Sequence, residues 1–226
     1  METLRKFFAI RWQRLYFFWI ENCTHLRPRD LKTIVAKKMP VVLISGIYTG
    51  GRSLLPLKQF LESQGWPVYL PAEKKNFARL PILAKQLERR IREIPAKKVQ
   101  IVAHSMGGLT ALWALQDPKL RARVAQVISL GAPFNGCILG SLAFWERKRN
   151  QKYLALHSAA IKKMQANRAA CGKIRALHAK FDELVFPEST TILKGARENT
   201  ELQVIGHAGL LLAKKTWRAI AKRLLK

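Results

Sequence analysis

The chain has 226 residues, 49% of them hydrophobic, which is enough for one domain with a substantial core. It carries 41 lysines and arginines against 14 aspartates and glutamates, a formal net charge of +27. Such a charge indicates attraction to nucleic acid, anionic lipid headgroups or an acidic partner, without selecting among them. The three cysteines, Cys23, Cys137 and Cys171, are widely spaced, which argues against a disulfide framework and favours a reducing compartment. A single disulfide between Cys137 and Cys171 is the alternative.

Residues 1–38 are expected to form a basic amphipathic N-terminal arm and a linker. Arginines interrupt the apolar stretch 4–20, no small-residue cleavage site follows, and its longest unbroken apolar piece is far shorter than the about 20 residues that span a bilayer. Apolar residues recur there at helical spacing: Leu4, Phe7, Phe8, Trp12, Leu15 and Trp19. This pattern fits either an interfacial helix on a membrane or a helix packed on the domain's own core.

From residue 39 to residue 226 the pattern alternates between strands and helices. Strands are expected at residues 40–45, 66–70, 99–103, 124–130, 174–179 and 200–205, and helices at 53–64, 81–93 and 107–116 and near the C-terminus. Repeated units of this kind predict an α/β fold, with a mostly parallel six-stranded sheet and helices on both faces. Residues 134–173 interrupt the pattern with a basic, helical stretch containing Leu142, Phe144 and Trp145, which fits either a lid or an ordinary crossover helix.

The stretch VQIVAHSMGG, residues 99–108, resembles a nucleophile elbow. A buried strand enters a helix through a sharp turn at His104, Ser105 and Met106, and the residues two before and two after the serine, Ala103 and Gly107, are small. The amide of Met106 would then be one donor to an oxyanion. A plain turn with Ser105 as a helix cap is the alternative.

A reactive serine needs a base and an acid that orients the base. Among the histidines, His207 directly follows an expected strand and is flanked by Gly206. The alternative interpretation is that His207 is a histidine of an ordinary surface loop without a catalytic role. Asp182 also follows a strand, with Glu183 as the other candidate acid, and the order Ser105, Asp182, His207 is that of α/β-hydrolases.

Residues 40–225 resemble the small bacterial triacylglycerol lipase and esterase branch of the α/β-hydrolase superfamily. The segments that carry the resemblance are PVVLISGI, AHSMGG, LGAPFNG, KFDELVFPEST and GHAGLL, in that order. The resemblance implies the α/β-hydrolase fold and a second oxyanion donor at the amide of Ile47, with Gly46 permitting close approach. Ser45 stands where the family usually has histidine.

The implied reaction is cleavage of acyl esters, lipid-like by preference, through an acyl-enzyme on Ser105. The alternatives are an acyltransferase on the same scaffold and a non-catalytic cationic protein that binds membranes. No metal or organic cofactor is implied. An anionic membrane surface is an expected partner, and nucleic acid is disfavoured because no recognised motif accompanies the charge. We expect a cytoplasmic protein that binds peripherally to the inner membrane face.

Overall fold

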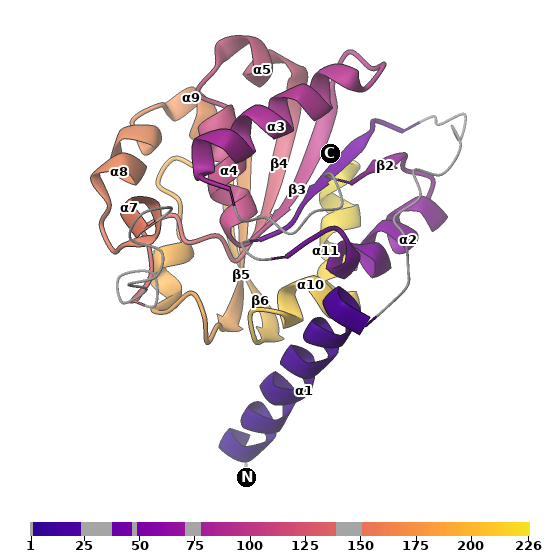
Figure 1. The fold of residues 1–226 in the computed structure, drawn as a ribbon, viewed down its shortest axis with the longest axis vertical. Coiled ribbons are helices and arrows are strands. Elements are labelled where there is room, and N and C mark those ends of the chain that lie inside the picture. Colours follow the sequence, from indigo (N-terminus) through magenta and orange to yellow (C-terminus); the bar gives the residue numbers. More distant parts are fainter. Residues whose placement is uncertain (1, 24–37, 47–48, 71–77, 139–150) are drawn as a thin grey trace.

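The computed structural model describes residues 2–23, 38–46, 49–70, 78–138 and 151–226 (Figure 1). Its strands form one six-stranded sheet in the order β2-β1-β3-β4-β5-β6, and every neighbouring pair runs parallel. The strands are β1 (Val41–Ile44), β2 (Val68–Tyr69), β3 (Val99–His104), β4 (Val124–Leu130), β5 (Ile174–Phe181) and β6 (Glu198–Ile205). The predicted six-stranded α/β architecture is confirmed, and the described sheet is parallel throughout.

Helices cover both faces of this sheet (Figure 1). The described helices are α1 (Glu2–Cys23), α2 (Leu55–Ser63), α3 (Leu80–Glu93), α4 (Met106–Ala114), α5 (Pro118–Arg123), α7 (Gln151–Leu154), α8 (Ala159–Gln165), α9 (Arg168–Cys171), α10 (Gly209–Leu212) and α11 (Lys214–Leu224). Two short 3₁₀ turns, η1 (Arg52–Leu54) and η3 (Glu188–Thr191), complete the described elements. Helices α3, α4 and α7 to α9 pack on one face, and α2, α10 and α11 pack on the other.

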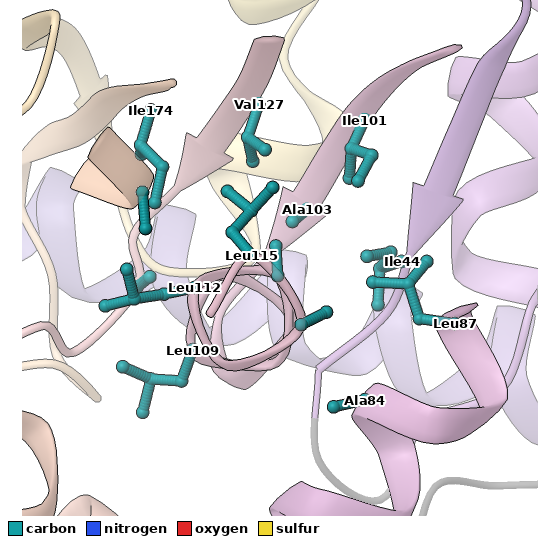
Figure 2. Packing of buried hydrophobic residues seen from close by; sticks show 14 of the residues in the cluster. Ile44, Ala84, Leu87, Ile101, Ala103, Leu109, Leu112, Leu115, Val127 and Ile174 are labelled. Atoms are coloured by element: carbon teal, nitrogen blue, oxygen red, sulfur yellow. The ribbon is translucent and has the colours of Figure 1, made fainter. Parts of the chain in front are cut away.

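The larger core lies between the sheet and helices α3 and α4. Leu109 and Leu112 of α4 and Leu115 at its C-terminal end are fully buried, and Leu115 lies beside Ala103 and Val127 of the sheet in Figure 2. Alternating strand residues supply the two faces, since Ile101 belongs to this cluster and Val102 to the opposite one. A sheet buried on both faces explains the nearly unbroken apolar strands of the sequence.

Two elements, one strand and one helix, differ from the sequence-based expectation for identifiable reasons. Strand β2 is only Val68–Tyr69, because Pro67 has no N–H to donate and contributes only its carbonyl, which accepts from Val41 N at 2.9 Å. Helix α5 was not expected, although Asp117 caps it by accepting a hydrogen bond of 2.8 Å from Lys119 N, with Pro118 at its first position.

The described part of the segment 134–173 packs onto the core. Tyr153 is buried and its ring meets that of Trp113 edge to face, 5.5 Å apart, while Ile161 and Met164 of α8 join the cluster beneath α4. Leu142, Phe144 and Trp145, on which the lid prediction rests, lie outside the described residues. Cys137 and Cys171 are both buried, and no disulfide joins one to the other.

Helix α1 contacts the body through only part of its surface. It meets η1, β6 and α10, and its N-terminal end extends beyond the rest of the molecule (Figure 1). Within the described residues, no helix combines the length and apolarity that a membrane crossing requires.

Candidate active site

Ser105 lies at the sharp turn between β3 and α4, at the carboxyl edge of the sheet. Its backbone has φ 56° and ψ −129°, a conformation that is costly for a residue with a side chain. The turn is held by a hydrogen bond of 2.8 Å from Ser105 N to Leu130 O, at the end of the neighbouring strand β4. Strain held in place by surrounding structure is the backbone feature of a nucleophile elbow.

The residues around this turn are small because the backbone of other elements approaches closely. A Cβ on Gly107 would lie 2.9 Å from Ser45 O and 3.0 Å from Ile44 O. A Cβ on Gly46 would lie 3.0 Å from Cβ of Ser105 and 3.4 Å from its Oγ. Ala103 is fully buried. Any larger side chain at Gly46 or Gly107 would therefore displace the serine or the strand beside it.

His207 and Asp182 form a buried pair at the same edge of the sheet. Nδ1 of His207 lies 2.7 Å from Oδ2 of Asp182. The backbone amides of Leu184 and Val185 donate to the other carboxylate oxygen, Oδ1, at 3.0 and 2.8 Å. Burial on its own would raise the pKa of Asp182, but the attraction of His207, its hydrogen bond and these two amides lower the pKa below the ordinary value. A charged carboxylate thus faces the imidazole and fixes its orientation.

Glu183 holds a different part of the same histidine. Its Oε2 accepts a hydrogen bond of 2.9 Å from the backbone N–H of His207. Of the two candidate acids, Glu183 has its carboxylate against the backbone of His207, and Asp182 has its carboxylate against the ring.

His104, the residue before the serine, is buried beside His207. The two rings have their centroids 4.6 Å apart, and Nε2 of His104 lies 3.2 Å from the carbonyl oxygen of His207. Because a carbonyl only accepts, Nε2 of a neutral His104 carries the proton of this hydrogen bond. Burial, followed by repulsion from His207, lowers the pKa of His104 to about 3. The sequence indicated only that His104 belongs to the elbow.

The serine and the Asp182–His207 pair converge on the end of β4. Leu130 O holds the amide of Ser105, and a Cβ on the next residue, Gly131, would lie 3.2 Å from Oδ2 of Asp182 and 3.4 Å from Cε1 of His207. Gly131 has φ 57°, which also favours glycine. The three side chains, which follow the ends of β3, β5 and β6, thus lie at one edge of the sheet.

An oxyanion site beside Ser105 needs backbone N–H groups without another partner. Met106 is the first residue of α4, so its N–H has no acceptor within the helix. Ile47, the predicted second donor, lies outside the described residues. The neighbouring loop is braced by Ser45, whose Oγ donates to Thr49 O at 3.2 Å.

The other candidate residues lie elsewhere or outside the described part of the chain. His178 lies within β5, His157 is exposed before α8, and Asp117 caps α5. His25 and Asp30 are outside the described residues. Across the described ranges, no group of three or more His, Cys, Asp or Glu side chains is arranged to hold a metal ion.

Comparison with known proteins finds matches to the part of the chain that carries the candidate active site. The sequence model of the lecithin:cholesterol acyltransferase family matches residues 65–206, more than half of the chain, which include Ser105 and Asp182 and end just before His207. A triacylglycerol lipase of Pseudomonas fragi is 32% identical over 111 residues. That match covers 45% of this chain and 37% of the Pseudomonas enzyme.

Solved structures show the same fold. Lipase B of Aspergillus fumigatus superposes with a TM-score of 0.70 at 19% identity, covering 86% of this chain and 54% of that one. The mature form of the Bacillus licheniformis lipase BlEst2 gives a TM-score of 0.68 at 17% identity, covering 87% of this chain and 96% of the other. The expected resemblance to lipases and esterases of the α/β-hydrolase fold is therefore confirmed.

Proposed function

We propose that this chain, which belongs to the lecithin:cholesterol acyltransferase family, is a serine hydrolase that cleaves carboxylic esters of lipid-like acyl groups. The observation that carries the proposal is the strained backbone of Ser105, set at the edge of the sheet where Asp182 orients His207. Lipid-like substrates are supported by the names of the relatives, lipases among them.

The first half of the reaction forms an acyl-enzyme. Oγ of Ser105 attacks the carbonyl carbon of the ester while Nε2 of His207 accepts its proton. The negative oxygen of the tetrahedral intermediate accepts hydrogen bonds from backbone amides, for which we assign Met106 and Ile47. The bond to the leaving oxygen then breaks, and the imidazolium of His207 protonates that oxygen to release an alcohol.

The second half returns the enzyme to its starting state. His207 takes a proton from water, whose oxygen attacks the acyl carbon, and Ser105 leaves with the proton that His207 gives back. Throughout, the charged Asp182 stabilises the imidazolium and keeps Nδ1 protonated. This role agrees with the lowered pKa of Asp182, which keeps the carboxylate ionised near neutral pH.

The proposal is tested by replacing the proposed nucleophile, Ser105. Ser105→Ala is expected to abolish labelling by a fluorophosphonate probe and to reduce hydrolysis of p-nitrophenyl esters by roughly 10⁴-fold or more. Ser63→Ala is the matched control, because that serine is exposed on α2, and it is expected to keep both signals. Labelling of Ser105→Ala at another residue, or its undiminished turnover, would reject the proposal.

Acyl transfer is the second candidate, and the family description favours it. The same acyl-enzyme would then be attacked by an alcohol in place of water. Product analysis with a long-chain ester and competing alcohols separates the two: free acid identifies hydrolysis, and a new ester identifies transfer. A graded panel of p-nitrophenyl esters gives the preferred acyl length.

A further inference from the structure

Helix α1 presents a continuous apolar face to solvent. Five large side chains at helical spacing are each between 48% and 71% exposed: Phe8, Trp12, Leu15, Tyr16 and Trp19, here called the outer face of α1. Soluble proteins rarely leave so many neighbouring aromatic side chains uncovered without a binding partner.

The opposite side of the same helix is seated on the loop that carries His207. A Cβ on Gly206 would overlap Oε1 of Gln13, and a Cβ on Gly209 would lie 3.0 and 3.1 Å from Oε1 and Nε2 of Gln13. Oε1 of Gln13 is buried there. Neighbouring Ala9 and Ile10 are half-buried on this side. The helix therefore packs on the body along one side and exposes its other side to solvent. It combines the two alternatives predicted for this segment, a helix packed on the domain and an interfacial helix.

The chemistry of the uncovered side selects a lipid surface. Tryptophan and tyrosine, with a large apolar ring and a polar atom, are the side chains that gather at the boundary between lipid and water. Exposed Arg11 and Arg14 lie on the same helix, and arginine side chains are long enough to carry their charge to anionic headgroups. A second copy of this chain is a poorer occupant, because each copy carries a formal charge of +27 and the copies repel.

We propose that α1 is an interfacial helix that docks this protein on an anionic membrane through its outer face. Because Gln13 packs against Gly206 and Gly209, on either side of His207, docking turns the active-site edge of the sheet toward the membrane.

Two further exposed residues lie near the loop on which Gln13 packs. Phe181 ends β5 and pairs with Ile205, and its carbonyl accepts a hydrogen bond from Gly206 N, so it adjoins the seat of Gln13. Exposed Lys180 precedes it and Asp182 follows it. The consequence for substrate, that an ester enters from the membrane, rests on the proposed function. The docking itself does not.

The experiment compares full-length variants in cosedimentation with phosphatidylcholine vesicles that contain or lack phosphatidylglycerol. Phe8→Gln/Trp12→Gln/Trp19→Gln is expected to reduce partitioning onto the anionic vesicles by about tenfold or more. The matched control is Ile82→Gln/Leu225→Gln, which removes apolar side chains that are 48% and 69% exposed on α3 and after α11. It is expected to bind as the unmodified protein does. Arg11→Gln/Arg14→Gln is expected to weaken the binding and its dependence on salt.

Each outcome decides the question. Unchanged partitioning of the triple variant, or equal binding to neutral and anionic vesicles, would overturn the docking proposal. Light scattering that shows a dimer dispersed by the triple variant would assign the outer face to a second copy instead. Hydrolysis of a soluble short-chain ester is expected to stay unchanged in the triple variant. In one further outcome, the triple variant loses vesicle binding while the unmodified protein shows no Ser105-dependent turnover. That result would refute the proposed function and leave the docking proposal standing.

Discussion

The backbone N–H of His207 donates a 2.9 Å hydrogen bond to the carboxylate of Glu183. The adjacent carboxylate, Asp182, lies 2.7 Å from the ring nitrogen of the same histidine. Consecutive acidic residues after β5 thus fix both the main chain and the imidazole of His207. Their different contacts predict different consequences of removing each charge.

Removing the carboxylate of Glu183 is expected to act through the position of His207. Glu183→Gln retains an oxygen that accepts from His207 N, so kcat/KM is expected to stay within about threefold of the original. Glu183→Ala leaves that N–H without its partner and is expected to lower kcat/KM by about tenfold. Steady-state kinetics with a p-nitrophenyl ester measures both. Equal losses in the two variants would show that the negative charge, and not the accepted hydrogen bond, is what matters.

Asp182→Asn is expected to lower kcat by roughly 10⁴-fold while leaving the loop in place. Asparagine keeps an Oδ1 that accepts from the amides of Leu184 and Val185, but it sets an uncharged group against Nδ1 of His207. Kinetics together with circular dichroism separates lost catalysis from lost structure. A folded Asp182→Asn enzyme with near-normal kcat, beside a Glu183→Gln enzyme without activity, would make Glu183 the acid.

His104 makes the native state sensitive to acid. The pKa of His104 is about 3 in the folded protein, chiefly because of its burial, against about 6.5 when unfolded. Below pH 6.5 the unfolded chain therefore binds a proton that the native state excludes. Stability contributed by neutral His104 is complete above pH 6.5 and declines, by at most about 1.4 kcal/mol per pH unit, as the pH falls toward 3.

The variant His104→Phe removes this titration. Its free energy of unfolding is expected to be lower at neutral pH, because the hydrogen bond to His207 O is lost, yet to decline less between pH 6.5 and pH 4. Urea titrations at a series of pH values measure the slope. Identical slopes in the two proteins would contradict a neutral, buried His104.

Gly206 is expected to tolerate no side chain, for two separable reasons. Its φ of 88° disfavours alanine, and a Cβ would also overlap Oε1 of Gln13. Gly206→Ala should therefore destabilise the protein by about 1–3 kcal/mol. In a double-mutant cycle, Gln13→Ala is expected to recover part of this loss, with a coupling of at least about 0.5 kcal/mol. Additive effects of the two substitutions would mean that α1 is not seated on the His207 loop in solution.

The sequence predicted those parts of the site that depend on local pattern and chain order. The turn at Ser105 is encoded by its own strand, helix and small neighbours, and the structure shows the expected strained conformation. The pairing of Asp182 with His207 follows from two strands that end at the same edge of a parallel sheet.

Contacts that depend on tertiary packing could not be predicted from local pattern and chain order. His104 touches a residue 103 positions away, and Gln13 packs on a loop near the other end of the chain. His104 lies in the elbow motif, but the motif does not say what its ring contacts. Gln13 belongs to no motif, and nothing in the sequence separates it from an ordinary helix glutamine. Helix α5 is a different case, because Asp117 followed by Pro118 is a local helix-start signal.

At the opposite edge of the sheet, Glu198 joins β6 to two other elements. Its carboxylate accepts hydrogen bonds from Arg175 of β5 at 2.7 Å and from Nε of Arg223 of α11 at 3.0 Å. The side chain of Arg175 is only 8% exposed, so it depends on this partner for its charge. The hydrogen bond from Arg223 is the main reason that the pKa of Glu198 falls to about 2.

Glu198→Gln is therefore expected to lower the free energy of unfolding by about 1–3 kcal/mol at neutral pH. Because the folded pKa lies below the unfolded value of about 4.3, the contribution of Glu198 is complete above pH 4.3 and is lost as the pH falls toward 2. The difference between original and variant, measured by urea unfolding, should narrow over that range. Glu93→Gln is the matched control: its carboxylate pairs with Arg89 on the exposed side of α3, and its removal is expected to cost less than about 0.5 kcal/mol. An equal cost for both variants would show that the buried Arg175 does not need its counter-charge.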